Sequence, residues 1–351
     1  MMNKRSVILF WLAAALLLAA GCHRLDPTQG EPGSLVLHLA SEQLGTKATP
    51  TFNKVLVVVA YRNRTGSDAA LNGTVAASTY LETTGTDITF ENLGTGDFTV
   101  YAFANVDHTA WGTVGTTAAS VLDGNGKVDV DRLLATITEA DGLPRPFPAT
   151  ATEAEIEAAL NTSLMTGRTD ITVNQAYTPA DVVLQHPVTR LNVTVYNNTH
   201  LDITLNMLSF GAFAMPTAYL FGRDENGDDV PDVPAGTPYA LCPVSSDLTI
   251  TASQVQTTIP MLVYENAAAA DQYRMYATVS LGGSSKHLGG AVDAGCALRK
   301  VKEGVSTPLT HMRRNQEVDI VMNVYYQDTA IYFNVSVEAW ADGGGGSHTF
   351  Q

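Results

Sequence analysis

The feature that most constrains the fold of this chain is the alternation of apolar and polar residues in two neighbouring segments, residues 318–326 and 331–339. A period of two places every second side chain on the same face of a strand, so each segment predicts a β-strand with one buried face. The tripeptide Gln327-Asp328-Thr329 between them is short enough for an antiparallel hairpin. The predicted buried positions of the two strands are Val318, Ile320, Met322, Val324, Ile331, Phe333, Val335 and Val337.

Comparable strand patterns recur along most of the chain. In residues 35–40 three leucines alternate with Val36, His38 and Ala40, which predicts a first strand that could be covered on both faces. Residues 54–61 are almost continuously apolar and β-branched, as expected of a buried central strand. Residues 87–91 and 97–104 predict a second hairpin around a glycine-containing turn. Further strands are predicted at residues 170–173, 188–196, 248–251 and 273–281.

Helical patterns are confined to a short part of the first half. Residues 131–139 and 152–160 carry apolar side chains at helical spacing, and a proline-rich stretch separates them. The second segment begins with Thr152-Glu153-Ala154-Glu155, the pattern of a capping box, in which backbone and side chains at the helix start bond to each other. We interpret the two segments as a helical insert in a β-domain.

The predicted fold class is all-β: two tandem antiparallel β-sandwiches with a short helical insert in the first. The patterns change character near residue 185, so the predicted N-terminal domain spans residues 34–184 and the C-terminal domain spans residues 185–351. A chain of 351 residues is long enough for two domains that each bury a core.

The start of the chain predicts export. Lys4 and Arg5 precede an unbroken apolar run at residues 7–18, and small residues at 19–21 follow it. This order is that of a secretory signal peptide, and the run is too short for a membrane-spanning helix.

A cysteine follows this signal directly. Cys22 after small residues is similar to a bacterial lipobox, in which the thiol is diacylated and the signal peptide, here residues 1–21, is removed just before it. Residues 22–33 contain prolines and glycines and few apolar residues, so they predict a flexible tether. A plain signal peptide with an incidental cysteine is the alternative.

Charge and cysteine content limit the partners and the bonds. The net charge of −15 argues against nucleic acid as a partner, because no basic surface is available to attract phosphate. Apart from Cys22, the chain has two cysteines, Cys242 and Cys296. In an oxidising compartment they could form a disulfide, and two buried free thiols are the alternative.

No sequence motif for catalysis or for a cofactor is present. The chain has no G-x-S-x-G, H-E-x-x-H, P-loop or dinucleotide-binding glycine pattern, and none of its histidines has a second histidine at metal-ligand spacing. We therefore expect no enzymatic activity and no cofactor, apart from a structural cation.

That cation is suggested by one acidic segment. Residues 224–232 place oxygen-bearing side chains at alternate positions, as a loop around a hard cation requires. The candidate calcium ligands are Asp224, Asn226, Asp228 and Asp232. A solvated acidic loop is the alternative, since Ala235 stands where an EF-hand loop has its final glutamate.

Several short segments, taken in order, resemble the fimbrillins, the pilin-like subunits of Bacteroidales type V fimbriae, over nearly the whole chain. The segments are the lipobox at Cys22, residues 35–40 followed by Gly45-Thr46-Lys47-Ala48, residues 54–61, residues 90–105, residues 188–193, Met312-Arg313-Arg314-Asn315 and Val337-Glu338-Ala339-Trp340. The resemblance implies two transthyretin-like sandwiches, a lipoprotein precursor at the cell outer membrane, and a place in a surface fimbria that supports adhesion.

The resemblance also implies a mechanism of assembly. A protease would cut between Lys47 and Ala48 and release the first strand together with the lipid. A C-terminal strand of another fimbrial subunit would then fill the vacated groove by β-augmentation. The donor strand implied in this chain carries Ile331, Phe333, Val335, Val337 and Trp340. The implied partners are other fimbrial subunits, the outer membrane through the lipid before processing, and a surface ligand of a host or bacterium.

Two other interpretations stay open. If Lys47 is not cut, Cys22 remains a permanent attachment, as a fimbrial anchor would require. Alternatively, the chain is a lipid-anchored surface β-sandwich that is not polymerised and captures glycans or proteins. The candidate contacts would then be the loops at residues 107–111 and 223–232.

Overall fold

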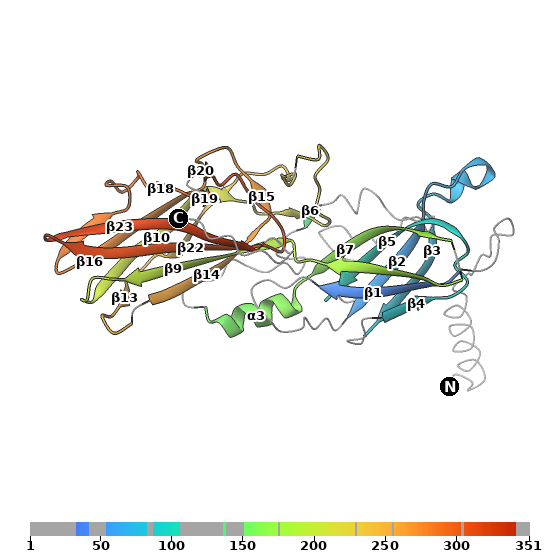
Figure 1. Cartoon of the computed structure of the whole chain (residues 1–351), viewed down its shortest axis with the longest axis horizontal. Coiled ribbons are helices and arrows are strands. Elements are labelled where there is room, and N and C mark those ends of the chain that lie inside the picture. The colour runs from blue at the N-terminus through green and yellow to red at the C-terminus, as the bar shows by residue number, and fades with distance from the viewer. Residues whose placement is uncertain are drawn as a thin grey trace, which may run out of the picture.

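The computed structural model describes residues 33–41, 54–82, 87–105, 136–137, 151–174, 176–228, 230–254, 256–302 and 305–341. These residues are nearly all β-structure and form two sandwiches arranged end to end along the long axis of the molecule (Figure 1). The predicted fold class is confirmed. Among the residues described, no helix is both long enough and apolar enough to cross a membrane.

The N-terminal sandwich consists of a four-stranded sheet and a three-stranded sheet. The first, in the order β3-β2-β5-β7, contains β2 (Val55–Tyr61), β3 (Val75–Leu81), β5 (Gly96–Ala104) and β7 (Met165–Val173). The second, in the order β4-β1-β8, contains β1 (Leu35–Ser41), β4 (Asp87–Phe90) and β8 (Thr178–Leu184). A single apolar cluster fills the space between the two sheets.

β2 is covered on both faces, as its composition predicts. Val55, Val57 and Val59 belong to the core between the two sheets. Leu56 and Val58 point to the other face of the sheet and belong to a second apolar cluster. A strand that buries both faces has no need of polar residues at alternate positions, which explains the continuous apolar run.

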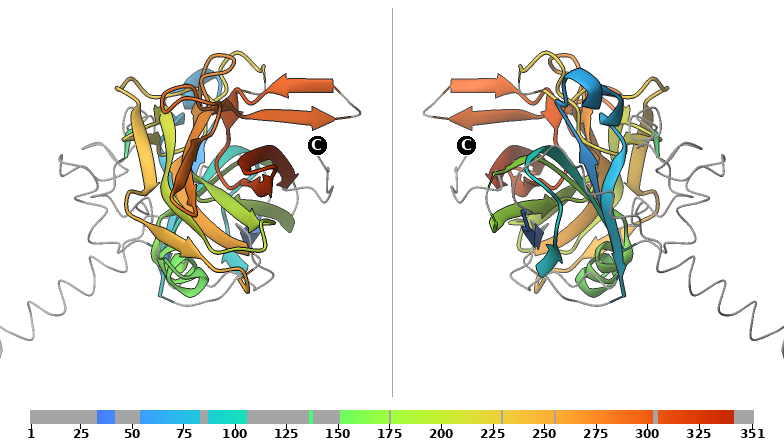
Figure 2. Two further views of the ribbon diagram at one scale, coloured as in Figure 1. Left: turned by 90° about the vertical axis from the view of Figure 1, so that its left-hand side faces the viewer. Right: turned by 90° about the vertical axis from the view of Figure 1, so that its right-hand side faces the viewer.

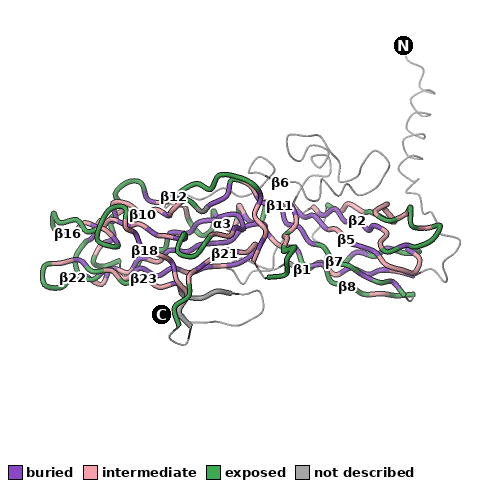
Figure 3. Tube along the Cα trace, turned by 90° about the horizontal axis from the view of Figure 1, so that it is seen from above, coloured by how far each residue is buried: buried purple, intermediate pink, exposed green. Residues whose placement is uncertain are grey.

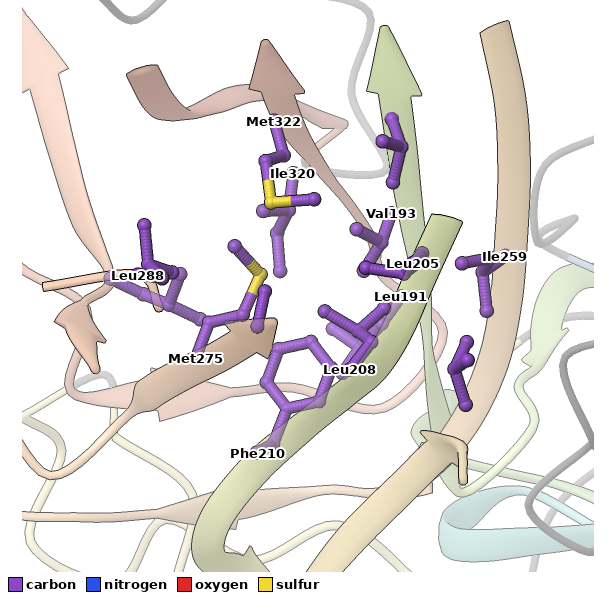
Figure 4. Close-up of a cluster of buried hydrophobic side chains, with 14 of the residues drawn as sticks. Leu191, Val193, Leu205, Leu208, Phe210, Ile259, Met275, Leu288, Ile320 and Met322 are labelled. Carbon is purple, nitrogen blue, oxygen red and sulfur yellow. The ribbon is translucent and has the colours of Figure 1, made fainter. Parts of the chain in front are cut away.

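The C-terminal sandwich is larger. One sheet, in the order β14-β9-β22-β23-β19-β20, contains β9 (Val188–Asn197), β14 (Gln256–Tyr264), β19 (Arg299–Lys302), β20 (Val305–Pro308), β22 (Glu317–Gln327) and β23 (Ala330–Ala341). The other contains β10 (Ile203–Ala214), β12 (Tyr239–Val244), β13 (Leu248–Ile250), β16 (Arg274–Leu281), β17 (Ser284–His287) and β18 (Cys296–Ala297). The short strands β15 (Asn266–Ala267) and β21 (His311–Met312) form a separate pair. Figure 4 shows apolar side chains from both large sheets meeting in the core between them.

The hairpin predicted at the C-terminal end is confirmed as β22 and β23. Gln327 pairs with Ala330, so Asp328 and Thr329 alone form the turn. Their φ angles of 50° and 67° are both positive, as a two-residue turn of the favoured hand requires. A different hairpin, β19 and β20, projects sideways from the body of the molecule (Figure 2).

Both sandwiches contain parallel as well as antiparallel neighbours. β1 is parallel to β8, β9 is parallel to β22, and β19 meets β23 in parallel. The sequence predicted antiparallel sandwiches. Alternation of side chains predicts which face of a strand is buried, but it carries no information on the direction of the neighbouring strand.

The helical insert was predicted correctly in one of its two segments. Helix α3 (Glu153–Thr162) begins with the expected capping box, in which the Glu155 amide donates to Thr152 Oγ1 and the Thr152 amide donates to Glu155 Oε2 at 2.6 Å. The helix predicted over residues 131–139 is wrong at its centre, where β6 (Thr136–Ile137) pairs with β11 (Ala218–Tyr219). Both β6 residues are β-branched, which favours the extended backbone of that pair.

The two sandwiches meet through a third apolar cluster, which we call the junction cluster. Its buried members are Leu56, Val58, Ala60, Phe103, Ile156, Leu160, Leu164, Val188, Ala218, Leu220, Leu262 and Tyr264. They come from the N-terminal sandwich, from α3 and from the C-terminal sandwich, so burial continues across the joint, as Figure 3 shows. β8 ends at Leu184 and β9 begins at Val188, on either side of the predicted domain boundary.

Candidate strand-acceptor groove

β1 occupies the middle of the three-stranded sheet of the N-terminal sandwich (Figure 1). It is antiparallel to β4 over residues 35–38 and parallel to β8 over residues 35–41. β1 therefore bridges two strands that do not pair with each other. We call the space that it fills between β4 and β8 the β1 groove.

The inward face of β1 is deeply buried. Leu35 and Leu37 are completely shielded from solvent, and Leu39 is 4% exposed. All three pack in the core of the N-terminal sandwich with residues of both sheets. Full burial of one leucine stabilises a protein by about 1.5–3 kcal/mol, so the three together contribute at most roughly 5–9 kcal/mol.

The start of β1 is held by backbone hydrogen bonds. The amide of Leu93 donates to the carbonyl of Gly33 at 2.9 Å, and the amide of Thr178 donates to the carbonyl of Ser34 at 2.8 Å. Arg64 holds the turn that contains Leu93, because its Nη1 donates to the carbonyl of Thr95 at 3.1 Å. A side chain at the next residue, Gly96, would place Cβ 2.3 Å from Arg64 Nη1, and its φ of 129° also favours glycine.

The outward face of β1 carries one charged contact. His38 Nδ1 lies 2.9 Å from Asp87 Oδ1, and the two side chains are 44% and 65% exposed. Asp87 is the partner of His38 on β4, and Asp181 is its partner on β8. The hydrogen bond to Asp87, with the negative charges of Asp87 and Asp181, raises the pKa of His38 above its ordinary value of 6.5.

An open cleft lies beside this groove, between β7 and β8. It has a volume of about 610 Å³ and is lined by Arg168, Asp170, Asp181, Phe221 and Arg314, among others. β7 and β8 are edge strands of their sheets, and in the described part of the chain an isolated bridge joins Thr166 of β7 to Gln185, the residue after β8. Asp181 therefore borders both the β1 groove and this cleft.

The residues predicted for lipidation and for processing, Cys22, Lys47 and Ala48, lie outside the described residues. So does the loop at residues 107–111, one of the two loops considered for ligand binding. The roles of these three residues and of this loop therefore stay predictions.

The predicted donor residues lie in β23, which belongs to the C-terminal sandwich of this chain. Ile331 and Val337 are buried in its core at 4% and 1% exposure, and Phe333 and Val335 pack against it while partly exposed. β23 pairs with β22 at eleven positions, including Trp340 opposite Val318. To serve another subunit, this strand would have to leave that ladder, and its role as a donor stays a prediction.

Cys242 and Cys296 are free thiols rather than a disulfide. Cys242 lies in β12 and Cys296 in β18, and these two strands are separated by β10 and β16. Three inter-strand spacings of about 4.8 Å amount to about 14 Å, twice the distance that a disulfide spans between Cα atoms. Cys242 is exposed and Cys296 is partly exposed, so the alternative of two buried free thiols is correct in the free thiols and wrong in their burial.

The carboxylates of the acidic loop accept hydrogen bonds from the loop's own backbone amides. Asp224 Oδ1 accepts from the amides of Gly227 and Asp228 at 2.8 and 3.2 Å, and Asp232 Oδ2 accepts from the amide of Glu225 at 3.0 Å. Asn226 Nδ2 donates to Asp228 Oδ2 at 3.0 Å. Within the described part of the chain, no three acidic, histidine or cysteine side chains converge where a metal could sit. Calcium binding here stays a prediction from the sequence.

Sequence reasoning missed β8 and the two aspartates that face His38. The segment that forms β8 has apolar residues at alternate positions, Ala180, Val182 and Leu184, and this signal could have identified the strand. No local pattern could have placed Asp87 and Asp181 on either side of His38, because that requires the order and register of three strands.

Comparison of the sequence with family models and with curated proteins finds no match. Comparison of the fold finds fimbrial proteins. The tip fimbrial protein Mfa3 of Porphyromonas gingivalis, with a C-terminal truncation, has a TM-score of 0.49 at 13% identity, over 88% of this chain and 99% of that chain. A fimbrilin, FimA, of the same organism has a TM-score of 0.45 at 12% identity, over 88% and 97%. A fimbrial assembly protein of Parabacteroides distasonis has a TM-score of 0.40 at 15% identity, over 88% and 98%.

Proposed function

We propose that this chain is a structural subunit of a cell-surface fimbria that supports adhesion. In this proposal it is exported as a lipoprotein, is carried by Cys22 at the outer membrane, and loses its first strand to a protease that cuts between Lys47 and Ala48. A strand of another subunit then occupies the β1 groove. The position of β1 in the middle of its sheet is the observation that carries the proposal.

Removal of β1 would leave an open groove whose filling by another strand is energetically favourable. The unpaired N–H and C=O groups along β4 and β8 and the space of three buried leucines would face water together. Unpaired strand edges and exposed apolar surface are both costly, and an added strand satisfies both at once.

Repetition of this contact would build a filament. The groove lies in the N-terminal sandwich, and the predicted donor strand lies in the C-terminal sandwich. A contact between two different surfaces of identical or related subunits is heterologous, and it extends head to tail unless the rotation closes a ring. The subunit's role is structural, so we propose no enzymatic activity.

A second function is favoured by one observation, the pairing of every residue of β22 with a residue of β23. In that function β1 and the lipid are both retained. The chain would then be a fimbrial anchor, or a surface β-sandwich lipoprotein that binds a glycan or protein without polymerising.

Intact mass and N-terminal sequencing of protein from its native cell surface distinguish the two functions. A mature start at Ala48 without lipid is expected for the polymerised subunit. A start at acylated Cys22 with the bond after Lys47 intact would overturn it in favour of the anchored form. The variant Lys47→Ala should retain β1, whereas the matched variant Lys54→Ala, in the next stretch of chain, should be processed normally.

A further inference from the structure

We infer that Asp87 and Asp181 make the β1 groove selective for the charge of the strand that fills it. The groove accepts a strand with a cationic or hydrogen-bond-donating side chain between its second and third buried apolar residues, and it disfavours a carboxylate there. This inference rests on the proposed function, since a strand of another subunit is the occupant that is selected.

The selectivity follows from the register of three strands. Residue 38 is the outward position between Leu37 and Leu39, and it faces Asp87 on one side and Asp181 on the other. The strand now in the groove places a histidine there, and its Nδ1 lies 2.9 Å from Asp87 Oδ1. The strand that occupies the groove in this structure therefore already has a side chain of the preferred kind at this position.

A carboxylate at the same position would meet two others. Neighbouring strands lie about 4.8 Å apart, so the backbones of Asp87 and Asp181 are about 10 Å from each other with residue 38 midway. Like charges directly opposite one another across a strand pair are destabilising. Arg168, Asp170 and Arg314 also line the cleft beside Asp181. Arg168 and Asp170 have opposite charges and Arg314 is paired with Glu265, so the balance at residue 38 stays negative.

The same rule sets the register of a strand such as β23. With Ile331, Phe333 and Val335 in the positions of the three leucines, Asn334 would lie between the aspartates and could donate to them. A shift by four residues would bring Glu338 to that position, where it would be repelled. Charge at one outward position thus distinguishes registers that the apolar pattern alone leaves equivalent.

The first test uses the intact full chain. The change His38→Asp should raise the equilibrium constant for unfolding about fivefold at low salt, and His38→Lys should lower it or leave it unchanged. Ala40→Asp is the matched control, because residue 40 also points outward from β1 but pairs with Val183 on β8 rather than with an aspartate. Equal effects of His38→Asp and Ala40→Asp would overturn the inference. The double change Asp87→Asn with Asp181→Asn should abolish the difference between them.

The second test measures exchange directly. A site for a specific protease is placed at residues 45–50 of the full chain, the chain is cut, and labelled peptides of residues 35–46 are added. Peptides with histidine, lysine or asparagine at position 38 should enter about five to ten times more readily than the peptide with the His38→Asp change, and high salt should narrow the ratio. Equal entry of all four peptides would overturn the inference and leave strand exchange standing. Failure of every peptide to enter would count against strand exchange, while the intact-chain series would still decide the charge preference.

Discussion

Arg314 and Glu265 form a buried ion pair at the joint between the two sandwiches. Arg314 Nε donates to Glu265 Oε2 at 3.0 Å, and Nη2 donates to Oε1. The same guanidinium donates to the carbonyls of Leu220 and Tyr219 at 3.3 and 3.0 Å, and Nη1 lies 3.5 Å from Thr166 Oγ1 of the N-terminal sandwich. One side chain therefore satisfies polar groups of both sandwiches in a site where water is nearly excluded, with exposures of 9% and 3% for the two partners.

The change Arg314→Ala should destabilise the protein by about 3–5 kcal/mol, because it leaves the Glu265 carboxylate buried without its cation. Urea denaturation measures the loss. Arg299→Ala is the control, since Arg299 pairs with Asp271 at 40% and 47% exposure, and exposed pairs contribute less than about 1 kcal/mol. Similar losses in the two variants would show that the buried pair has no special role. Replacing Arg314 and Glu265 together by methionine should recover much of the loss.

The change Leu37→Ala should cost about 2–5 kcal/mol, because it removes a completely buried side chain from the middle of β1. The control is Ala40→Ser on the outward face of the same strand, which should stay within about 0.5 kcal/mol of the unchanged protein. Thermal and urea unfolding of the full chain measure both. A loss for Leu37→Ala no larger than that of the control would mean that β1 is not packed as described.

NMR titration of the histidine ring should find the pKa of His38 above 6.5, because the protonated ring bonds to Asp87. A raised pKa in the folded state means that the stabilisation is fully present at acidic pH below the unfolded pKa and is lost as the pH rises through the folded value. Asp87→Asn should bring the pKa back toward 6.5. A pKa that the substitution does not change would contradict the pairing.

His186 should behave in the opposite way. Burial lowers its pKa to about 4, and its Nδ1 lies 3.1 Å from Ser163 Oγ and 3.3 Å from the carbonyl of Leu164. The unfolded chain binds a proton on this ring below about pH 6.5, so its contribution to stability is complete above that pH and falls as the pH drops toward 4.

Urea unfolding at pH 7.5 and 4.5 tests this contribution. The drop in stability between the two should be about 2–3 kcal/mol larger in the unchanged protein than in His186→Asn, which keeps a donor near the position of Nδ1 but does not titrate. Equal drops would show that His186 does not carry the acid sensitivity.

The sequence predicted those elements whose cause is local. The β22–β23 hairpin follows from alternation on both sides of a short polar connection, which the structure shortens by one residue because Gln327 pairs with Ala330. Helix α3 follows from a capping box before apolar residues at helical spacing. The continuous apolar run in β2 correctly predicted a strand with both faces covered.

The elements that it did not predict depend on neighbours distant in sequence. Thr136 and Ile137 lie in a segment whose apolar residues have helical spacing, but they pair with Ala218 and Tyr219, more than 80 residues later in the chain. The parallel placement of β8 beside β1 also depends on pairing between segments far apart in the sequence. Residues 35–40 were predicted as a strand that could be covered on both faces, and the groove it fills was implied only by the resemblance. Its flanking aspartates were not predicted, because they come from β4 and β8.

The strands of both sandwiches run largely along the long axis of the molecule (Figure 1). A pull along that axis, with one end held at the β1 groove and the other at β23, would slide neighbouring strands past each other. All hydrogen bonds of a ladder then bear the load together, whereas a pull across the axis would break them one after another. Because the junction cluster and the contact of Arg314 with Thr166 join the two sandwiches, such a load would pass from one ladder to the next through packed side chains.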